Sequence, residues 1–277
     1  SANMRGMYND RASEVSDATE YGHRLSFSYQ GKFLDDTLGV SLGYARLFQP
    51  SVSTQFIGLA YNGVTDVDGI YTNSECTEEE IAPNCELISE GFEMQHKGGE
   101  ETRDGYVAAF EWAPIDTFTL KADAFISKFD SEAFARGFRV KLGGINAGIT
   151  NPVVVNRSVI GGTFSRTDNS FTRVELVNDD NQDFDSVTNL GVNANWEISP
   201  DLAVQFDVSR SSAESDFRNG LLWSLVGEDA TVANPVFDEN VQISYLLNGL
   251  NLPDIGFNQS DAFTDLDRVM VSKYGIY

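Results

Sequence analysis

Apolar and polar residues alternate along several segments of this chain with a period of two. In segment 38–44, Leu, Val, Leu and Tyr alternate with Gly and Ser, and in 190–198 Leu, Val, Ala, Trp and Ile alternate with Gly, Asn and Glu. Because successive side chains of a β-strand point to opposite faces, this pattern predicts strands with one apolar and one polar face. We expect seven strands and a less clear eighth at 265–277, the seven being 3–12, 20–32, 38–47, 103–112, 118–130, 185–198 and 202–210.

The connections between these strands alternate between short and long. The tight turns are expected at 33–37, 113–117 and 199–201, and the long connections at 48–102, 131–184 and 211–264. All the long connections then leave the sheet at the same end. Strands of about ten residues in this arrangement are typical of a transmembrane β-barrel with short periplasmic turns and long external loops. No segment reaches the ~18 apolar residues of a membrane-spanning helix.

A soluble antiparallel sandwich is the alternative, because a sheet with one buried face produces the same alternation. Long structureless connections are uncommon in compact domains of that kind, which favours the membrane protein. Trp112 and Trp196 lie just before tight turns, and Phe33 and Phe118 occupy comparable positions. Aromatic rings at one level suit a membrane interface, and a role as core residues beside turns is the other interpretation.

Acidic residues dominate the charge of the chain. Its 277 residues include 42 acidic and 19 basic ones, for a net charge of −23, so a nucleic-acid partner is not expected. The 48–102 connection contains eleven acidic residues and one basic residue, and 211–264 contains eight and one, whereas 131–184 is balanced at six of each. Such acidic loops are compatible with simple solvation of an exposed surface, and with binding of divalent cations or of a cationic ligand.

Two cysteines, Cys76 and Cys85, lie in the first long connection among several glutamates. We expect them to form a disulfide that pins this loop, because a protein that crosses an oxidising periplasm acquires such bonds. Free thiols are one alternative. Metal binding is another, but two thiols without a third or fourth ligand do not make a zinc site.

Residues for catalysis are not apparent. The two histidines, His23 and His96, have no nucleophile beside them in a triad arrangement. Segment 178–185 is rich in Asp and Asn, but it lacks the glycine and the distal glutamate of an EF-hand loop. We therefore expect that the protein is not an enzyme, and we expect no cofactor and no metal site.

Several strand and turn motifs occur along the chain, at 4–10 (MRGMYND), 38–46 (LGVSLGYAR) with the following Gln49-Pro50-Ser51, 103–114 (RDGYVAAFEWAP), 127–130 (SKFD) and 150–154 (TNPVV). These motifs resemble those of TonB-dependent outer-membrane receptors, most closely the proteobacterial branch linked to carbohydrate uptake. The resemblance implies a large single-chain barrel closed around an N-terminal plug. It also implies energy coupling to the inner-membrane TonB system through a short N-terminal box.

Compared with that family, residues 1–277 are expected to form one partial barrel domain. A signal peptide is not expected here, because residues 1–10 have no apolar region. A plug and a TonB box are not expected either, because neither is found ahead of the first strand. Plugged transporters need about 22 strands, so we expect an open, strongly curled antiparallel sheet. The expected partners are outer-membrane lipid, the TonB system through the missing plug and box, and a small-molecule nutrient. The expected location is the outer membrane of a Gram-negative bacterium.

The resemblance also suggests uptake of a bulky nutrient, for which we favour an oligosaccharide because sugar rings stack on exposed aromatic rings. Tyr61, Tyr71 and Trp223 are the candidate ligand-binding residues, and packing within the loops is the alternative role of each. A siderophore or cobalamin is the alternative ligand. A passive or adhesive outer-membrane barrel with acidic surface loops is the alternative function.

Overall fold

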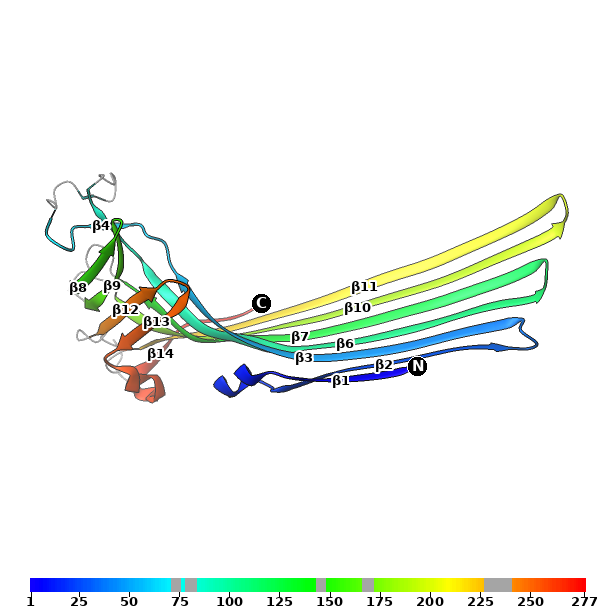
Figure 1. Ribbon diagram of the computed structural model, residues 1–277, viewed down its shortest axis with the longest axis horizontal. Coiled ribbons are helices and arrows are strands. Elements are labelled where there is room, and N and C mark those ends of the chain that lie inside the picture. Colours follow the sequence, from blue (N-terminus) through cyan, green and yellow to red (C-terminus); the bar gives the residue numbers. More distant parts are fainter. Residues whose placement is uncertain (71–75, 78–83, 143–147, 166–171, 227–240) are drawn as a thin grey trace.

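Eight strands form one antiparallel sheet, which dominates the molecule (Figure 1). The computed structural model describes residues 1–70, 76–77, 84–142, 148–165, 172–226 and 241–277. The strands, in their order across the sheet, are β1 (Ala2–Tyr8), β2 (Tyr21–Phe33), β3 (Leu38–Gly58), β6 (Gly91–Ile115), β7 (Phe118–Lys141), β10 (Arg173–Ser199), β11 (Leu202–Val226) and β14 (Val269–Ile276). All eight strands that the alternation predicts are therefore present, and the all-β, antiparallel fold class is confirmed.

Three tight turns join the long strands at one end of the sheet, at the right of Figure 1. They connect β2 to β3, β6 to β7 and β10 to β11, at the expected positions. The first turn places Leu34, Asp35 and Asp36 in the left-handed region, with φ of 55°, 52° and 67°. Aspartate tolerates this conformation better than most residues, since its short side chain bonds to the local backbone.

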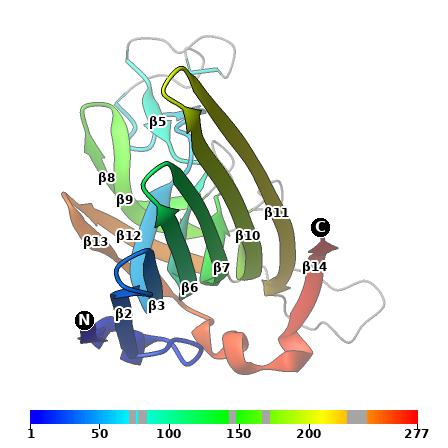
Figure 2. The ribbon, with the colours of Figure 1, turned by 90° about the vertical axis from the view of Figure 1, so that its right-hand side faces the viewer.

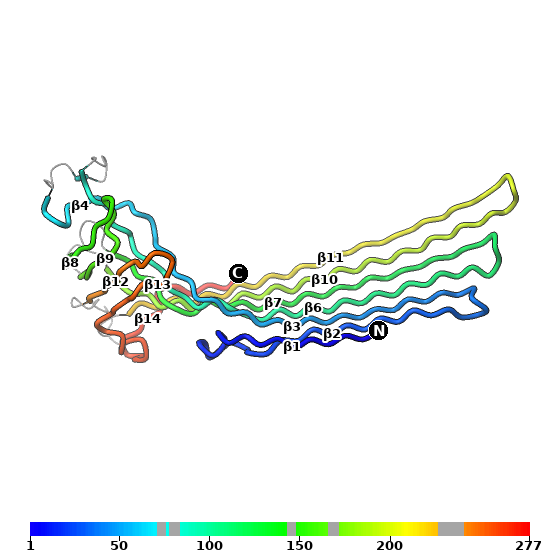
Figure 3. Tube along the Cα trace, viewed as in Figure 1, coloured from blue at the N-terminus to red at the C-terminus, as the bar shows by residue number. Residues whose placement is uncertain are grey.

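The long strands extend much further than the sequence pattern indicates. β6 and β11 each contain 25 residues, or roughly 85 Å at ~3.4 Å per residue. The expected connections at 48–102, 131–184 and 211–264 are therefore wrong at their flanks, where β3, β6, β7, β10 and β11 continue. Their alternation is weak because both faces of these extensions carry polar residues, and main-chain hydrogen bonds between neighbouring strands hold them. Figure 3 follows these strands along their whole length.

The remaining parts of the connections are not structureless. They contribute a second, six-stranded sheet in the order β13, β12, β9, β5, β4, with β8 paired to β9. Its strands are β4 (Gly63–Thr65), β5 (Glu86–Ile88), β8 (Gly148–Val155), β9 (Ser158–Ser165), β12 (Gln242–Asn248) and β13 (Asn251–Phe257). Figure 1 shows this smaller sheet at the end of the molecule opposite the tight turns.

The hydrophobic core lies where the smaller sheet meets the ends of the long strands. Phe92 and Val140 of the long strands pack in one cluster with Phe164, Ile243 and Tyr245 of the smaller sheet. Each of these five side chains is buried. Aromatic pairing adds to the packing, since the rings of Phe164 and Tyr245 stack with their centroids 5.2 Å apart.

Three short 3-10 helices complete the described structure: η1 (Asp10–Glu14), η4 (Ser260–Thr264) and η5 (Leu266–Arg268). No helix in the described residues is long and apolar enough to cross a membrane.

The large sheet is open, with β1 and β14 as its edge strands. β14 pairs with β11 only from Gly220 to Val226, so the outer edge of residues 202–218 has no paired strand in the described part of the chain. Figure 2, which looks along the strands from the turn end, shows how strongly the sheet twists. The expected open sheet is present, and no closed barrel is formed by the described strands.

Candidate functional site

The strand register collects the apolar residues of six strands on one face of the large sheet. One cross-strand row contains Val40, Phe110, Ala122, Val192 and Val208. The row nearer the turns contains Leu38, Trp112, Leu120, Ala194 and Phe206. The row further from the turns contains Tyr29, Leu42, Ala108, Ala124 and Leu190, and it ends on β11 at the charged Arg210. We call this set of rows the apolar band.

The apolar band is open to its surroundings. Val192 is 38 %, Phe110 40 % and Phe206 57 % exposed, and no residue of the band is buried. Monomeric soluble proteins rarely expose a continuous apolar surface of this kind, because water makes it unfavourable. Exposed apolar surfaces of this kind typically mark sites of contact with a membrane or another protein.

Aromatic residues border the apolar band on both sides. Trp112, Trp196 and Phe118 lie near the turns, with the rings of Trp112 and Phe118 edge to face at 6.2 Å between centroids. At the other border the rings of Tyr44 and Tyr106 lie 5.0 Å apart, and the Tyr44 hydroxyl donates a hydrogen bond of 2.8 Å to Asp104.

Beyond the tyrosine border the same face becomes charged. Arg46 forms an ion pair with Asp104 at 3.0 Å, and Lys128 and Glu214 lie in the same cross-strand row. Along β10 the band runs from Trp196 to Thr188, an advance of eight residues, or about 27 Å at ~3.4 Å per residue. Strands of a membrane barrel are tilted, so the height of the band along the membrane normal would be somewhat less than its length along the strand. This height is comparable to the ~25 Å apolar belt of a membrane barrel.

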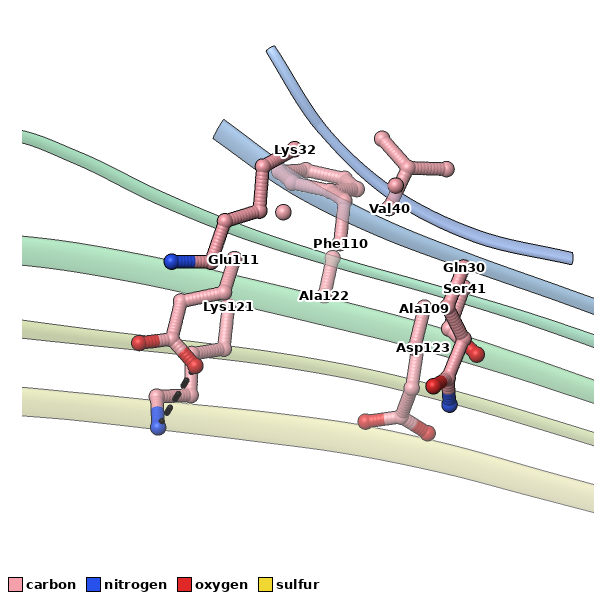
Figure 4. A pocket seen from close by; sticks show the side chains of 12 residues that line it. Gln30, Lys32, Val40, Ser41, Ala109, Phe110, Glu111, Lys121, Ala122 and Asp123 are labelled. Carbon is pink, nitrogen blue, oxygen red and sulfur yellow. Dashed lines mark ion pairs between the residues drawn. The ribbon is translucent and has the colours of Figure 1, made fainter. Parts of the chain in front are cut away.

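The opposite face of the same strands is polar (Figure 4). Glu111, Lys121 and Asp123 point to one side of the sheet in this view, and Val40 and Phe110 point to the other. Lys121 Nζ lies 3.1 Å from Glu111 Oε2. A shallow hollow of about 690 Å³ lies along these residues. Such a surface suits contact with water or with polar groups, and it is too open to enclose a small ligand.

Trp223, one of the three candidate ligand-binding residues, lies on β11 of the large sheet and not in a loop. The guanidinium of Arg139 lies 4.4 Å and the ammonium of Lys273 4.8 Å from the centre of its ring. Its indole N–H donates a hydrogen bond of 2.8 Å to Asp179. Because two cations already occupy the surroundings of the ring, Trp223 is poorly placed to stack on a sugar.

The two candidate tyrosines lie in the first connection. Tyr61 is half-buried just before β4, and this burial raises the pKa of its hydroxyl. Burial is also the main cause that raises the pKa of the core residue Tyr245, and Tyr61 is near enough to raise that pKa further. Tyr61 thus belongs to the surroundings of the core, whereas Trp223 belongs to a cluster on the long strands, so the fold does not bring these two together. Tyr71 lies outside the described residues.

A cavity of about 540 Å³ lies between the ends of the long strands and β13, and the sequence pattern does not reveal it. Phe138, Phe257 and Phe263 line it, with centroids of neighbouring rings 5.3 and 6.0 Å apart, and Asp254 and Ser260 add polar groups. These residues come from β7, β13 and η4, so only the folded chain makes them neighbours. In the sequence, only the aromatic residues at 257 and 263 could have pointed to this cavity.

Cys76 and Cys85 form a disulfide, with their Cα atoms 5.6 Å apart, so the chain has no free cysteine.

Segment 178–185, rich in Asp and Asn, lies within β10. Asp179 accepts the hydrogen bond of Trp223, and Asp180 pairs with Arg136 at 2.6 Å. These two carboxylates thus have partners within the protein.

No protein-family model, no curated protein and no solved structure matches this chain.

Proposed function

We propose that the large sheet is part of the wall of an outer-membrane β-barrel, with the apolar band in contact with lipid. The observation that carries this proposal is the exposed band of about 27 Å, bordered by aromatic rows and followed by charged residues on the same face. A soluble sandwich would need a second sheet over this band. The smaller sheet instead lies at the far end of the strands (Figure 1).

We further propose that the barrel belongs to a TonB-dependent receptor that takes up a bulky nutrient. The sequence motifs that resemble this family support the proposal. The strands support it as well, since their roughly 85 Å exceeds the apolar band by far and would raise a tall wall above the membrane. An external wall of this height provides a vestibule in which a large molecule can be captured.

An oligosaccharide is the ligand that we favour. The cavity lined by Phe138, Phe257 and Phe263 combines aromatic rings with the polar groups of Asp254 and Ser260. Sugar rings present apolar faces to aromatic side chains and hydroxyls to carboxylates, so this lining suits them. A siderophore or cobalamin is the alternative ligand of such a receptor. A passive or adhesive barrel, whose acidic loops face the medium, is the alternative function.

Cell fractionation followed by uptake assays tests this proposal. With an antibody against the 48–102 segment, the native protein is expected in the outer membrane with a mass well above 30.5 kDa, because a plugged barrel needs about 22 strands. A gene deletion is expected to abolish uptake of labelled oligosaccharides, and a protonophore is expected to abolish it in the parent strain. Loss of siderophore or cobalamin uptake would select the alternative ligand, and a soluble protein would contradict the membrane location.

A further inference from the structure

Three carboxylates converge where β4 meets β5 in the smaller sheet. Thr65, the last residue of β4, pairs with Glu86, the first residue of β5. Asp66 and Asp68 follow β4 directly along the chain. One carboxylate oxygen from each of Asp66, Asp68 and Glu86 can be chosen so that all three lie within 4.8 Å of one another.

Glu86 is buried in this cluster without a partner for one of its oxygens. The residue is only 2 % exposed, and Oε2 is buried with no hydrogen-bond partner. No ion pair to Glu86, Asp66 or Asp68 is formed by the described residues. A buried carboxylate without a counter-charge among the described residues is strongly unfavourable, and a bound cation would offset this cost.

The neighbouring carboxylates add to the free-energy cost of holding a negative charge on the buried Glu86. Burial is the main cause that raises the pKa of this carboxyl group, and the charges of Asp68 and Asp66 raise it further. A cation placed among the three oxygens would reverse both effects, because it replaces lost hydration and offsets the mutual repulsion of the carboxylates.

The local backbone holds the two aspartates in place. The amide of Gly69 donates a hydrogen bond of 2.9 Å to Asp66 Oδ1, and the amide of Ile70 donates one of 3.0 Å to Asp68 Oδ1. Gly69 has φ of 75°, a conformation that glycine adopts without strain. Both of these bonds go to Oδ1, and the second oxygen of each aspartate accepts neither of them.

We propose that Asp66, Asp68 and Glu86 bind one Ca²⁺ ion. Calcium binds oxygen ligands at about 2.3–2.6 Å, so oxygens on opposite sides of the ion lie up to about 5 Å apart, which accommodates this cluster. Three carboxylates leave positions for backbone carbonyls and water, as calcium requires with its 6–8 ligands. This site differs from our expectation that the chain has no metal site, because the pattern of acidic residues does not show which of them converge.

The ion would join two segments of the first connection. Glu86 directly follows Cys85, whose carbonyl accepts a hydrogen bond of 2.8 Å from Arg157, and the aspartates belong to the turn after β4. Calcium would therefore fix this turn to the strand that the disulfide anchors. The site would bind calcium whether or not the large sheet spans a membrane.

Equilibrium dialysis of the complete protein against ⁴⁵Ca²⁺ tests the proposal. We expect binding in the range of about 10⁻⁴–10⁻³ M, typical of extracellular calcium sites. Glu86→Gln and Asp68→Asn are each expected to remove one bound ion per protein or to weaken its binding roughly tenfold or more. Asp201→Asn, which removes an exposed carboxylate in the turn between β10 and β11, is the control and should leave the calcium binding unchanged.

Thermal unfolding separates the loss of the ion from misfolding. In EDTA, Glu86→Gln is expected to unfold at the same temperature as the wild type or higher, because the substitution removes an unpartnered buried charge. Added Ca²⁺ should raise the unfolding temperature of the wild type and leave that of Glu86→Gln unchanged. Unaltered calcium stoichiometry and affinity in both Glu86→Gln and Asp68→Asn, or equal affinity for Mg²⁺, would overturn the assignment.

Discussion

Val192 and Asn193 are neighbours in the chain but lie on opposite faces of the large sheet. Val192 belongs to the apolar band, with Ala122 and Val208 as its cross-strand neighbours. Asn193 lies on the polar face, where its amide donates a hydrogen bond of 2.9 Å to Asp207. Because a strand alternates its side chains, these two positions compare the two environments at the same depth.

Val192→Arg is expected to destabilise the protein by about 2–4 kcal/mol, since a charge on the lipid-facing side at mid-bilayer is poorly solvated. Asn193→Arg is expected to have a small effect, because water reaches the polar face. Denaturant unfolding of both variants in lipid vesicles measures the difference. Equal tolerance of arginine at the two positions would contradict the assignment of the faces.

The facing of most residues within the apolar band could be derived from the sequence alone, because apolar and polar residues alternate clearly in segments such as 38–44 and 190–198. The alternation is interrupted by Val107 and Phe125, which pair with each other on the opposite face. The surroundings of Trp223 could not. Arg139, Asp179 and Lys273, which contact its ring or its N–H, come from three different strands, and only the register brings them together. The same limit applies to Asp66, Asp68 and Glu86, whose convergence depends on the pairing of β4 with β5.

Each long strand consists of two parts, and the sequence pattern predicts only the part near the turns. In the part near the turns, one face is apolar, and this half of the strand is evident from its period. In the part near the smaller sheet, charged pairs such as Arg139 with Glu93 and Arg136 with Asp180 bridge neighbouring strands. Backbone pairing extends through this polar part without an apolar stripe, so the alternation ends before the strand does.

The disulfide between Cys76 and Cys85 is expected to stabilise the element that it closes. The bond spans nine positions of the sequence, and closing so short a loop restricts the unfolded chain by roughly 2–3 kcal/mol. The double variant Cys76→Ser/Cys85→Ser should therefore lower the free energy of local opening at β5 by about this amount. Amide hydrogen exchange measures it, with β10 as the internal control. Unchanged protection of Glu86–Ile88 would contradict this stabilising role.

At the scale of the whole molecule, the large sheet combines an open edge with an uncovered apolar face. On the edge of β11 away from β10, residues 202–218 have backbone groups that no other described strand pairs, and such groups are costly in hydrocarbon unless another strand covers them. The openness of the sheet was an expectation from the resemblance to plugged transporters, which need about 22 strands. The smaller sheet and its core were not predictable in the same way, since its strands are short and the pairings of β9 with β12 and with β5 join segments far apart in the sequence.

The three tryptophans lie at different positions along the length of the long strands. Trp112 and Trp196 border the apolar band near the turns. Trp223 pairs with Val177, and β10 advances eleven residues between Val177 and the tyrosine border at Thr188, or about 37 Å at ~3.4 Å per residue. In a membrane, Trp196 would thus lie at one interface and Trp223 well outside the bilayer.

Fluorescence quenching by brominated lipids tests most directly whether the apolar band contacts lipid. Two variants of the complete protein are required, Trp112→Phe/Trp223→Phe, which retains Trp196, and Trp112→Phe/Trp196→Phe, which retains Trp223. In vesicles, we expect strong quenching of Trp196, greatest when bromine lies near the headgroups, and no quenching of Trp223. Equal quenching of the two tryptophans, or none of either, would contradict a lipid-facing band.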